Sequence, residues 1–263
     1  MSNIDSIQLY QFPISHYCEK IRWALDYKGL QYKQINCLPG LHAIKTKNMA
    51  KFSSVPILKH KGSVIQDSAN IIDYLEKNFP DKPLNFSDEQ LNQQAIEWER
   101  FADECIGPHV RRIMYHELLN HPNIVIPLFS HQGPWYSGLY FKLAYPKLSQ
   151  IMRKLMKIND KNVRKSKEIL HDSLSKLNQH LFINLSDKTI DPCLTKNYLV
   201  GGRFSRADLS VSALLAPLFS PKEYGLNWPK TFPPEIQSLI KTFEPHMDYA
   251  KQCYASSRIN NND

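Results

Sequence analysis

The chain has 263 residues, 42% of them hydrophobic and 11% aromatic, and a formal net charge of +8 at pH 7. This length allows two domains or one large one, and the composition indicates a globular, soluble protein. No apolar run approaches the roughly 20 residues of a membrane-spanning helix, and residues 1–5 lack the features of a signal peptide. Nine glycines are few, which favours a mostly helical protein over a turn-rich all-β fold.

The cysteines give no sign of a disulfide framework or a metal site. There are five, an odd number, and no pair has the spacing typical of zinc ligands. We therefore expect no metal and a reducing cytoplasmic location. The five are Cys18, Cys37, Cys105, Cys193 and Cys253.

The positive charge is concentrated in one segment. Residues 142–167 carry nine Lys or Arg against the single acid Asp160, which accounts for the whole net charge. We interpret the segment as a solvated helical face, with Ile151, Leu155, Met156 and Ile158 on its packed side. Contact with nucleic acid or an acidic membrane is the alternative interpretation, as is attraction of anionic substrates.

The first 80 residues or so alternate between strand and helix patterns. We expect strands at 7–10, 32–36, 55–59 and 64–65, and helices at 18–28, 41–51 and 68–78. Lys61-Gly62 lies between the last two strands, which predicts a hairpin. The resulting order is the thioredoxin arrangement, with the hairpin at the antiparallel edge of a mixed sheet.

After Pro80 and Pro83 the pattern becomes helical. We predict a linker at 84–90 between a domain at 1–83 and an all-helical domain at 91–255. The first long helix should kink or break at Gly107-Pro108. The polar segment 186–197 reads as a loop, and residues 256–263 as a disordered tail.

Ser15 lies where the first strand gives way to the first helix, and Cys18 follows three residues later. Backbone N–H groups at a helix N-terminus stabilise an anion and lower the pKa of a thiol placed there. The segment resembles a glutaredoxin Cys-x-x-Cys motif in which Ser15 replaces the first cysteine. This position is therefore a candidate for sulfur chemistry.

Val55-Pro56 stands at the start of the expected third strand. We predict a cis peptide bond, which would turn the N–H and C=O of Val55 outward to pair with an extended peptide. The alternative is a trans proline on an edge strand.

Asp67-Ser68 precedes the helix at 68–78. In the simpler interpretation Asp67 is only an N-cap. In the functional one, Asp67 meets an ammonium group while Ser68 and the helix N-terminus hold the adjacent carboxylate.

Taken together, these motifs resemble the cytosolic glutathione S-transferase family, and the resemblance extends over the whole chain. It implies an α/β thioredoxin-like N-terminal domain followed by an all-α domain. In that family a buried helix begins with Ser/Thr-x-x-Asp, which Ser205 and Asp208 match. These two residues predict a capping box, with Phe204 packing on Leu209.

The resemblance also implies roles for single residues. Ser15 would face the glutathione sulfur, as serine does in the tau, theta and zeta classes, and donate a hydrogen bond to the thiolate. Val55 and Pro56 would hold the cysteinyl backbone, and Asp67 and Ser68 the γ-glutamyl end. The glycyl carboxylate would meet His42 or Lys45. An electrophile pocket would be lined by Arg111, Tyr115, Trp135 and Tyr136.

The sequence therefore predicts a cytoplasmic, homodimeric glutathione transferase that conjugates glutathione to small, partly apolar electrophiles, as in detoxification. One alternative is a glutathione-dependent thiol oxidoreductase or peroxidase that uses Cys18, although an inert, buried Cys18 is the simpler interpretation. Tyr17 could also offer a hydroxyl to the thiolate, whereas Tyr10 reads as a packing residue. A non-catalytic binding protein with the same fold is the third hypothesis.

Overall fold

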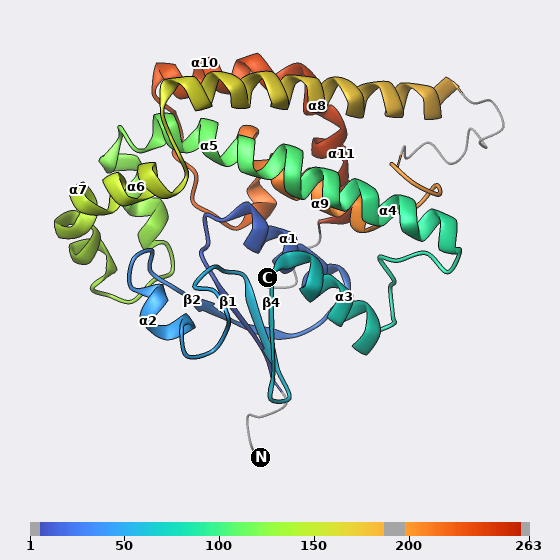
Figure 1. The fold of residues 1–263 in the computed structure, drawn as a ribbon, viewed down its shortest axis with the longest axis horizontal. Coiled ribbons are helices and arrows are strands. Elements are labelled where there is room, and N and C mark those ends of the chain that lie inside the picture. Colours follow the sequence, from blue (N-terminus) through green and yellow to red (C-terminus); the bar gives the residue numbers. More distant parts are fainter. Residues whose placement is uncertain (1–5, 187–197, 259–263) are drawn as a thin grey trace.

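A computed structural model describes residues 6–186 and 198–258 (Figure 1). Its N-terminal part holds a four-stranded sheet in the order β2-β1-β3-β4. β2 runs parallel to β1, while β3 is antiparallel to both β1 and β4, so the predicted mixed sheet with a hairpin edge is confirmed. The strands are β1 (Ile7–Gln11), β2 (Tyr32–Asn36), β3 (Ile57–His60) and β4 (Ser63–Gln66).

Three helices belong to this part of the molecule: α1 (His16–Tyr27), α2 (His42–Thr46) and α3 (Ser68–Asn78). α1 begins two residues before the predicted start because Ser15 caps it. α2 has only five residues, fewer than the predicted 41–51. α1 packs against α3 on one side and against α9 (Arg206–Leu215) of the helical part on the other.

The helical part starts with a long rod made of α4 (Glu89–Phe101), a π-helical turn η2 (Ala102–Ile106) and α5 (Gly107–Leu118) (Figure 1). Glu89 lies inside the predicted linker 84–90. The kink expected at Gly107-Pro108 is replaced by η2, which ends just before Pro108. Because proline has no N–H to donate, the preceding turn widens and the rod continues.

α6, α8, α9 and α10 pack on this rod, while α7 packs on α6 and α11 on α9. α8 runs along α5, and α9 lies between α1, α4 and α11. Every residue of α9 is buried, and Ser205 and Asp208 form the predicted capping box. The α/β-plus-all-α class is therefore confirmed. Residue 186, the first of the predicted loop 186–197, ends α8, and residues 187–197 lie outside the described residues. The helices are α6 (Pro122–Ser130), α7 (Ser137–Leu155), α8 (Asp160–Ser186), α10 (Pro234–Phe243) and α11 (Asp248–Ser257).

Buried charges join the two parts. Lys20 of α1 is fully buried, and its Nζ lies 2.8 Å from Glu99 Oε1 and 2.8 Å from Asp103 Oδ2. Arg206 at the start of α9 binds the same Glu99 and also Asp73 of α3. Lys20 and Arg206 therefore fix α1 and α3, which carry the candidate site residues, to the helical part.

The predicted disordered tail is wrong for its first three residues. Ser256 and Ser257 complete α11, and the Arg258 side chain is buried. Its guanidinium binds Glu19 (2.8 Å) and Asp26 (2.6 Å) of α1. Long-range ion pairs hold this segment, and nothing in its local composition indicates them. Residues 259–263 lie outside the described part of the chain.

The basic segment covers the second half of α7 and the start of α8. Its predicted packed side is wrong in two places, because Ile151 and Leu155 are exposed. Leu148 and Met152 pack in their place. None of the described helices combines the length and apolar character needed to cross a membrane.

Candidate functional site

A cleft of about 350 Å³ opens where the end of β4 and the start of α3 face the helical rod. It brings together Val55, Pro56, Asp67 and Ser68, which the sequence singled out as one binding site. Arg111 of α5, predicted for an electrophile pocket, lines this same cleft. The other lining residues are Tyr17, Phe52, Ser54, Gln66 and Asp103.

The Val55–Pro56 peptide bond is cis, as predicted. In the described part of the chain, neither the N–H nor the C=O of Val55 has a backbone hydrogen-bond partner. The Gln66 amide holds the preceding loop, donating to the carbonyls of Phe52 (2.8 Å) and Ser54 (2.7 Å). Val55 thus presents backbone groups that could pair with an extended peptide.

Asp67 is the N-cap of α3. Its Oδ1 accepts bonds from the N–H groups of Ala69 (3.0 Å) and Asn70 (3.4 Å). The capping interpretation is therefore correct for this oxygen, while Oδ2 takes no part in these bonds. Asp67 also has a φ of 83°, a left-handed value that is unfavourable for a residue with a side chain. Such backbone conformations are concentrated at ligand sites, where the surrounding structure enforces them.

Ser15 caps α1, and its Oγ accepts a bond from the Cys18 N–H (3.4 Å). This bond uses a lone pair and leaves the hydroxyl proton to be donated. Ser15 is not among the residues that line the cleft, but Tyr17, two positions later, is. Ser15 therefore lies at the N-terminus of α1, the positive end of the helix dipole, two residues before the cleft residue Tyr17.

Cys18 is fully buried. Burial raises the pKa of its thiol and outweighs the opposing hydrogen bond to Ser15. Because the reactive form of cysteine is the thiolate, this environment is typical of an inert core residue.

The helical wall of the cleft contains contacts that the sequence did not predict. The Tyr17 hydroxyl donates to the Asp103 carbonyl (2.8 Å), while the Asp103 carboxylate binds Lys20. A Cβ at Gly107 would come within 2.4 Å of the Tyr17 oxygen, so only glycine leaves room for this ring. Asp103 belongs to η2, and no local motif marks it. Nothing in the sequence marks Gln66 as a site residue except its position directly before Asp67-Ser68.

Besides Ser15 and Cys18, four predicted site residues do not line the cleft. His42 packs edge-on against Phe12, and Tyr115 lies near Phe129 on the inner side of α5. Trp135 is 94% exposed, and Tyr136 beside it is also exposed. The structure thus brings only Arg111 of the predicted electrophile-pocket residues into the cleft.

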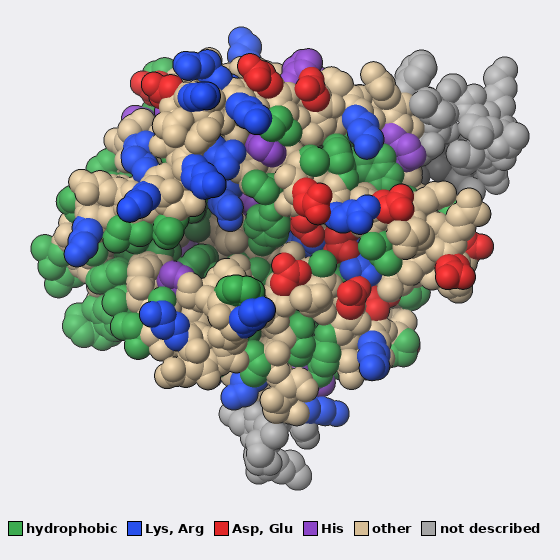
Figure 2. All heavy atoms as spheres, viewed as in Figure 1, with side chains coloured by type: hydrophobic (Ala, Val, Ile, Leu, Met, Phe, Trp, Pro, Cys, Tyr) green, Lys and Arg blue, Asp and Glu red, His purple; other side chains and the backbone are tan. Residues whose placement is uncertain are grey.

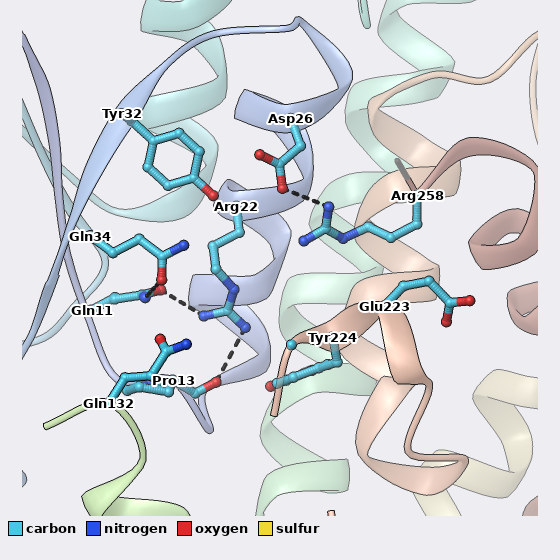
Figure 3. A pocket seen from close by; sticks show the side chains of 11 residues that line it. Gln11, Pro13, Arg22, Asp26, Tyr32, Gln34, Gln132, Glu223, Tyr224 and Arg258 are labelled. Atoms are coloured by element: carbon cyan, nitrogen blue, oxygen red, sulfur yellow. Dashed lines mark hydrogen bonds and ion pairs between the residues drawn. The ribbon is translucent and has the colours of Figure 1, made fainter. Parts of the chain in front are cut away.

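A second, smaller cavity of about 190 Å³ lies between β1, α1 and the C-terminal segment (Figure 3). Arg22 reaches into it and donates to Gln11 Oε1 (2.6 Å) and the Pro13 carbonyl (3.2 Å). Across the cavity Arg258 is paired with Asp26 (Figure 3). Since its arginines are paired with acids of the same chain, we interpret this cavity as structural. No cluster of potential metal ligands occurs within residues 6–186 and 198–258.

These features define a class of protein. A thioredoxin-like domain whose cis-proline loop and helix N-terminus form a peptide-sized cleft is joined to an all-helical domain. Residues 9–83 match the family model "Glutathione S-transferase, N-terminal domain". Residues 9–83 therefore carry the N-terminal domain of the glutathione S-transferase family.

Individual proteins agree with this assignment. The chain is 40% identical over 102 residues to Glutathione S-transferase 1 of Dianthus caryophyllus, covering 36% of this chain and 45% of that protein. It is 26% identical over 224 residues to Glutathione S-transferase TCHQD of Arabidopsis thaliana, covering 81% and 77%. In most of these matches the chain spans about half the length of the curated relative.

Among solved structures, the fold is similar to the β-etherase LigF from Sphingobium sp. strain SYK-6. The TM-score is 0.65 at 19% identity, with 97% of each chain covered. Structures of similar fold also include complexes with glutathione. These similarities support the same fold for this chain.

Proposed function

We propose that the cleft binds glutathione and that the protein conjugates its thiolate to small electrophiles. One observation carries this proposal. The unpaired N–H and C=O of Val55 lie in the same cleft as Asp67, Ser68 and the N-terminus of α3. These groups match the main chain, the ammonium and the carboxylate of an extended γ-glutamyl tripeptide.

Each part of glutathione is bound by different residues of the cleft. Val55 pairs with the cysteinyl backbone, and Ser68 with the α3 N-terminus holds the γ-glutamyl carboxylate. Asp67, with Asp103 across the cleft, faces the ammonium. Arg111 adds a positive charge to the same cleft, which suits an anionic peptide. Glutathione bound in this way places its cysteinyl sulfur toward the start of α1.

Ser15 activates the thiol. Its Oγ accepts from the Cys18 N–H, and its hydroxyl proton, which also faces the Cys18 thiol, turns to the sulfur of bound glutathione. A hydrogen bond to the thiolate favours the charged form, and the N-terminus of α1 stabilises the same charge. The thiolate is then ready at neutral pH to attack a carbon that bears a leaving group.

Two alternatives from the sequence fit the geometry less well. A redox mechanism needs an accessible thiol of low pKa, whereas Cys18 is buried and its pKa is raised by burial. A non-catalytic binding role would leave the donor capacity of Ser15 unused. The domain limits 1–83 and 91–255, a cytoplasmic location and a homodimer remain part of the same proposal.

The test compares Ser15→Ala, Ser15→Thr and Cys18→Ser with the wild type. The readouts are conjugation of 1-chloro-2,4-dinitrobenzene and glutathione-dependent reduction of a disulfide. We expect Ser15→Ala to lower kcat on the order of 100-fold, as when one donor to a developing anion is removed. Ser15→Thr keeps both the cap and the hydroxyl and should retain activity.

Thermal unfolding controls for the lost cap, which costs about 1 kcal/mol. Disulfide reduction that disappears in Cys18→Ser would establish the redox mechanism instead. A wild type that binds glutathione but turns over neither substrate would establish the binding role.

A further inference from the structure

The outer face of α7 combines exposed apolar residues with lysines. Six of the ten exposed large hydrophobic residues in the described part of the chain lie between positions 135 and 155. Trp135 is 94% exposed, Leu143 77% and Leu155 76%. We define the α7 face as these three residues with Leu139, Ile151, Lys142, Lys147 and Lys154.

The opposite side of α7 is buried in the helical part of the molecule, which leaves the α7 face exposed. Phe141, Tyr145, Leu148 and Met152 follow one another at helical spacing and are buried against the rest of the helical part. α7 is therefore apolar on both sides, but only one side is covered. Soluble monomers rarely expose a contiguous apolar surface, so such a face indicates a partner.

The charge of the face identifies the partner. Residues 118–159 contain no Asp or Glu at all, while they include five Lys or Arg. In Figure 2, hydrophobic side chains gather over α7 at the left edge of the molecule, with Lys and Arg next to them. A partner must therefore be both negatively charged and able to accept leucine and tryptophan side chains.

We propose that the α7 face docks on the surface of a membrane that contains anionic phospholipids. Helices that lie in a membrane interface combine Lys or Arg with Trp and Leu in this way. The lysine ammonium groups reach the phosphates while their stems and the leucines enter the headgroup region. Trp135 suits the interface itself, where tryptophan is enriched.

Two other partners fit less well. A second copy of this chain docked face to face would bring Lys142, Lys147 and Lys154 against the same lysines, with no Asp or Glu in residues 118–159 to neutralise them. Nucleic acid would satisfy the lysines but leave Leu139, Leu143 and Leu155 in water. Of these three partners, only an acidic lipid surface accommodates both kinds of side chain.

The test is co-sedimentation of the full chain with vesicles of phosphatidylcholine alone or with about one-third phosphatidylserine. We expect binding only to the acidic vesicles, and less of it at high salt. Replacing Lys142, Lys147 and Lys154 by Gln should lower the partition coefficient on the order of 100-fold. Leu139→Ser with Leu143→Ser should lower it at least about 10-fold.

Matched control variants distinguish vesicle binding by the α7 face from vesicle binding through the net positive charge of the protein. Replacing the exposed Lys222, Lys230 and Lys241 by Gln removes the same charge elsewhere and should leave vesicle binding unchanged. Circular dichroism and thermal unfolding should not differ among the variants, because every substituted side chain is exposed.

Three results would overturn the proposal. The first is a wild type that does not bind acidic vesicles. The second is a wild-type dimer in light scattering that becomes monomeric in the Leu139→Ser, Leu143→Ser variant. The third is vesicle or oligonucleotide binding that depends on the lysines but not on the leucines.

Discussion

At the scale of single residues, the start of α1 holds an unusual histidine. His16 is buried next to Ser15, and its Nε2 has no hydrogen-bond partner within the described residues. Burial, together with the charge of Arg111, lowers the pKa of His16 to about 3 against the effect of a backbone bond with Gly107. The folded protein therefore keeps this imidazole neutral at physiological pH.

A pH-dependent stability follows from His16. In the unfolded chain a histidine has a pKa of about 6.5, so below this value the unfolded state binds a proton that the folded state does not. The free energy of unfolding should therefore fall as the pH falls from about 6.5, by up to about 1.4 kcal/mol per pH unit for this group. Urea unfolding at several pH values measures the slope.

His16→Leu should make that slope shallower. It should not abolish it, because burial also lowers the pKa of His42, His109 and His246. An identical slope in His16→Leu and the wild type would show that His16 does not contribute.

Residue-scale prediction from sequence succeeded where local chemistry decides the geometry. Asp67 caps the helix that follows it, and Val55-Pro56 is cis. Asp103 and Gln66 were not predicted because their places in the cleft depend on how distant segments pack. Trp135 was assigned to a pocket from the family resemblance and its aromatic side chain, and neither determines burial.

At the scale of elements, α9 depends on one buried carboxylate. Asp208 Oδ2 accepts from the Ser205 N–H (2.8 Å) and hydroxyl (2.7 Å). Its Oδ1 accepts from the Leu199 N–H (2.8 Å) and the Tyr249 hydroxyl. The capping box thus also connects α9 to α11 and to the segment before it.

Asp208→Asn should destabilise the protein by about 3 kcal/mol, because an amide NH2 would face the two Ser205 donors and leave them unpaired. Chemical denaturation measures this change. Asp88→Asn is the matched control, since Asp88 is an exposed N-cap of α4 and asparagine caps equally well. Equal effects of the two substitutions would contradict a special role for Asp208.

Elements were predicted well where each has a single apolar pattern. The 32–36 strand and the 68–78 helix were placed to the residue. The packed side of α7 was not predicted correctly, because apolar residues lie on two sides of this helix and periodicity does not show which side packs. Ile151 and Leu155, which were predicted to be packed, belong instead to the exposed apolar residues of the α7 face.

At the scale of the whole molecule, the chain end closes the structure onto α1. Arg258 is separated from Glu19 by 239 positions, yet its Nε lies 2.8 Å from Glu19 Oε1. The Trp23 indole N–H donates to the Ser257 carbonyl (3.0 Å) next to it. Contacts this far apart in sequence leave no local pattern, which is why residues 256–258 were expected to be disordered.

We expect Arg258→Met to lower the free energy of unfolding by about 3–5 kcal/mol, because it removes a buried cation and leaves Glu19 and Asp26 with less compensation. Urea unfolding measures the loss. Arg153→Met, at a partly exposed arginine of α7, controls for the substitution itself and should cost at most about 1 kcal/mol.

The pH dependence separates this electrostatic cause from lost packing. Without the guanidinium, burial should raise the pKa of the Asp26 carboxyl further above its unfolded value. The folded state then binds protons that the unfolded state does not, so its stability is retained at low pH and lost as the pH rises. The deficit of Arg258→Met relative to the wild type should therefore shrink in acid. A deficit that is the same at all pH values would mean that Arg258 stabilises the chain end by packing alone.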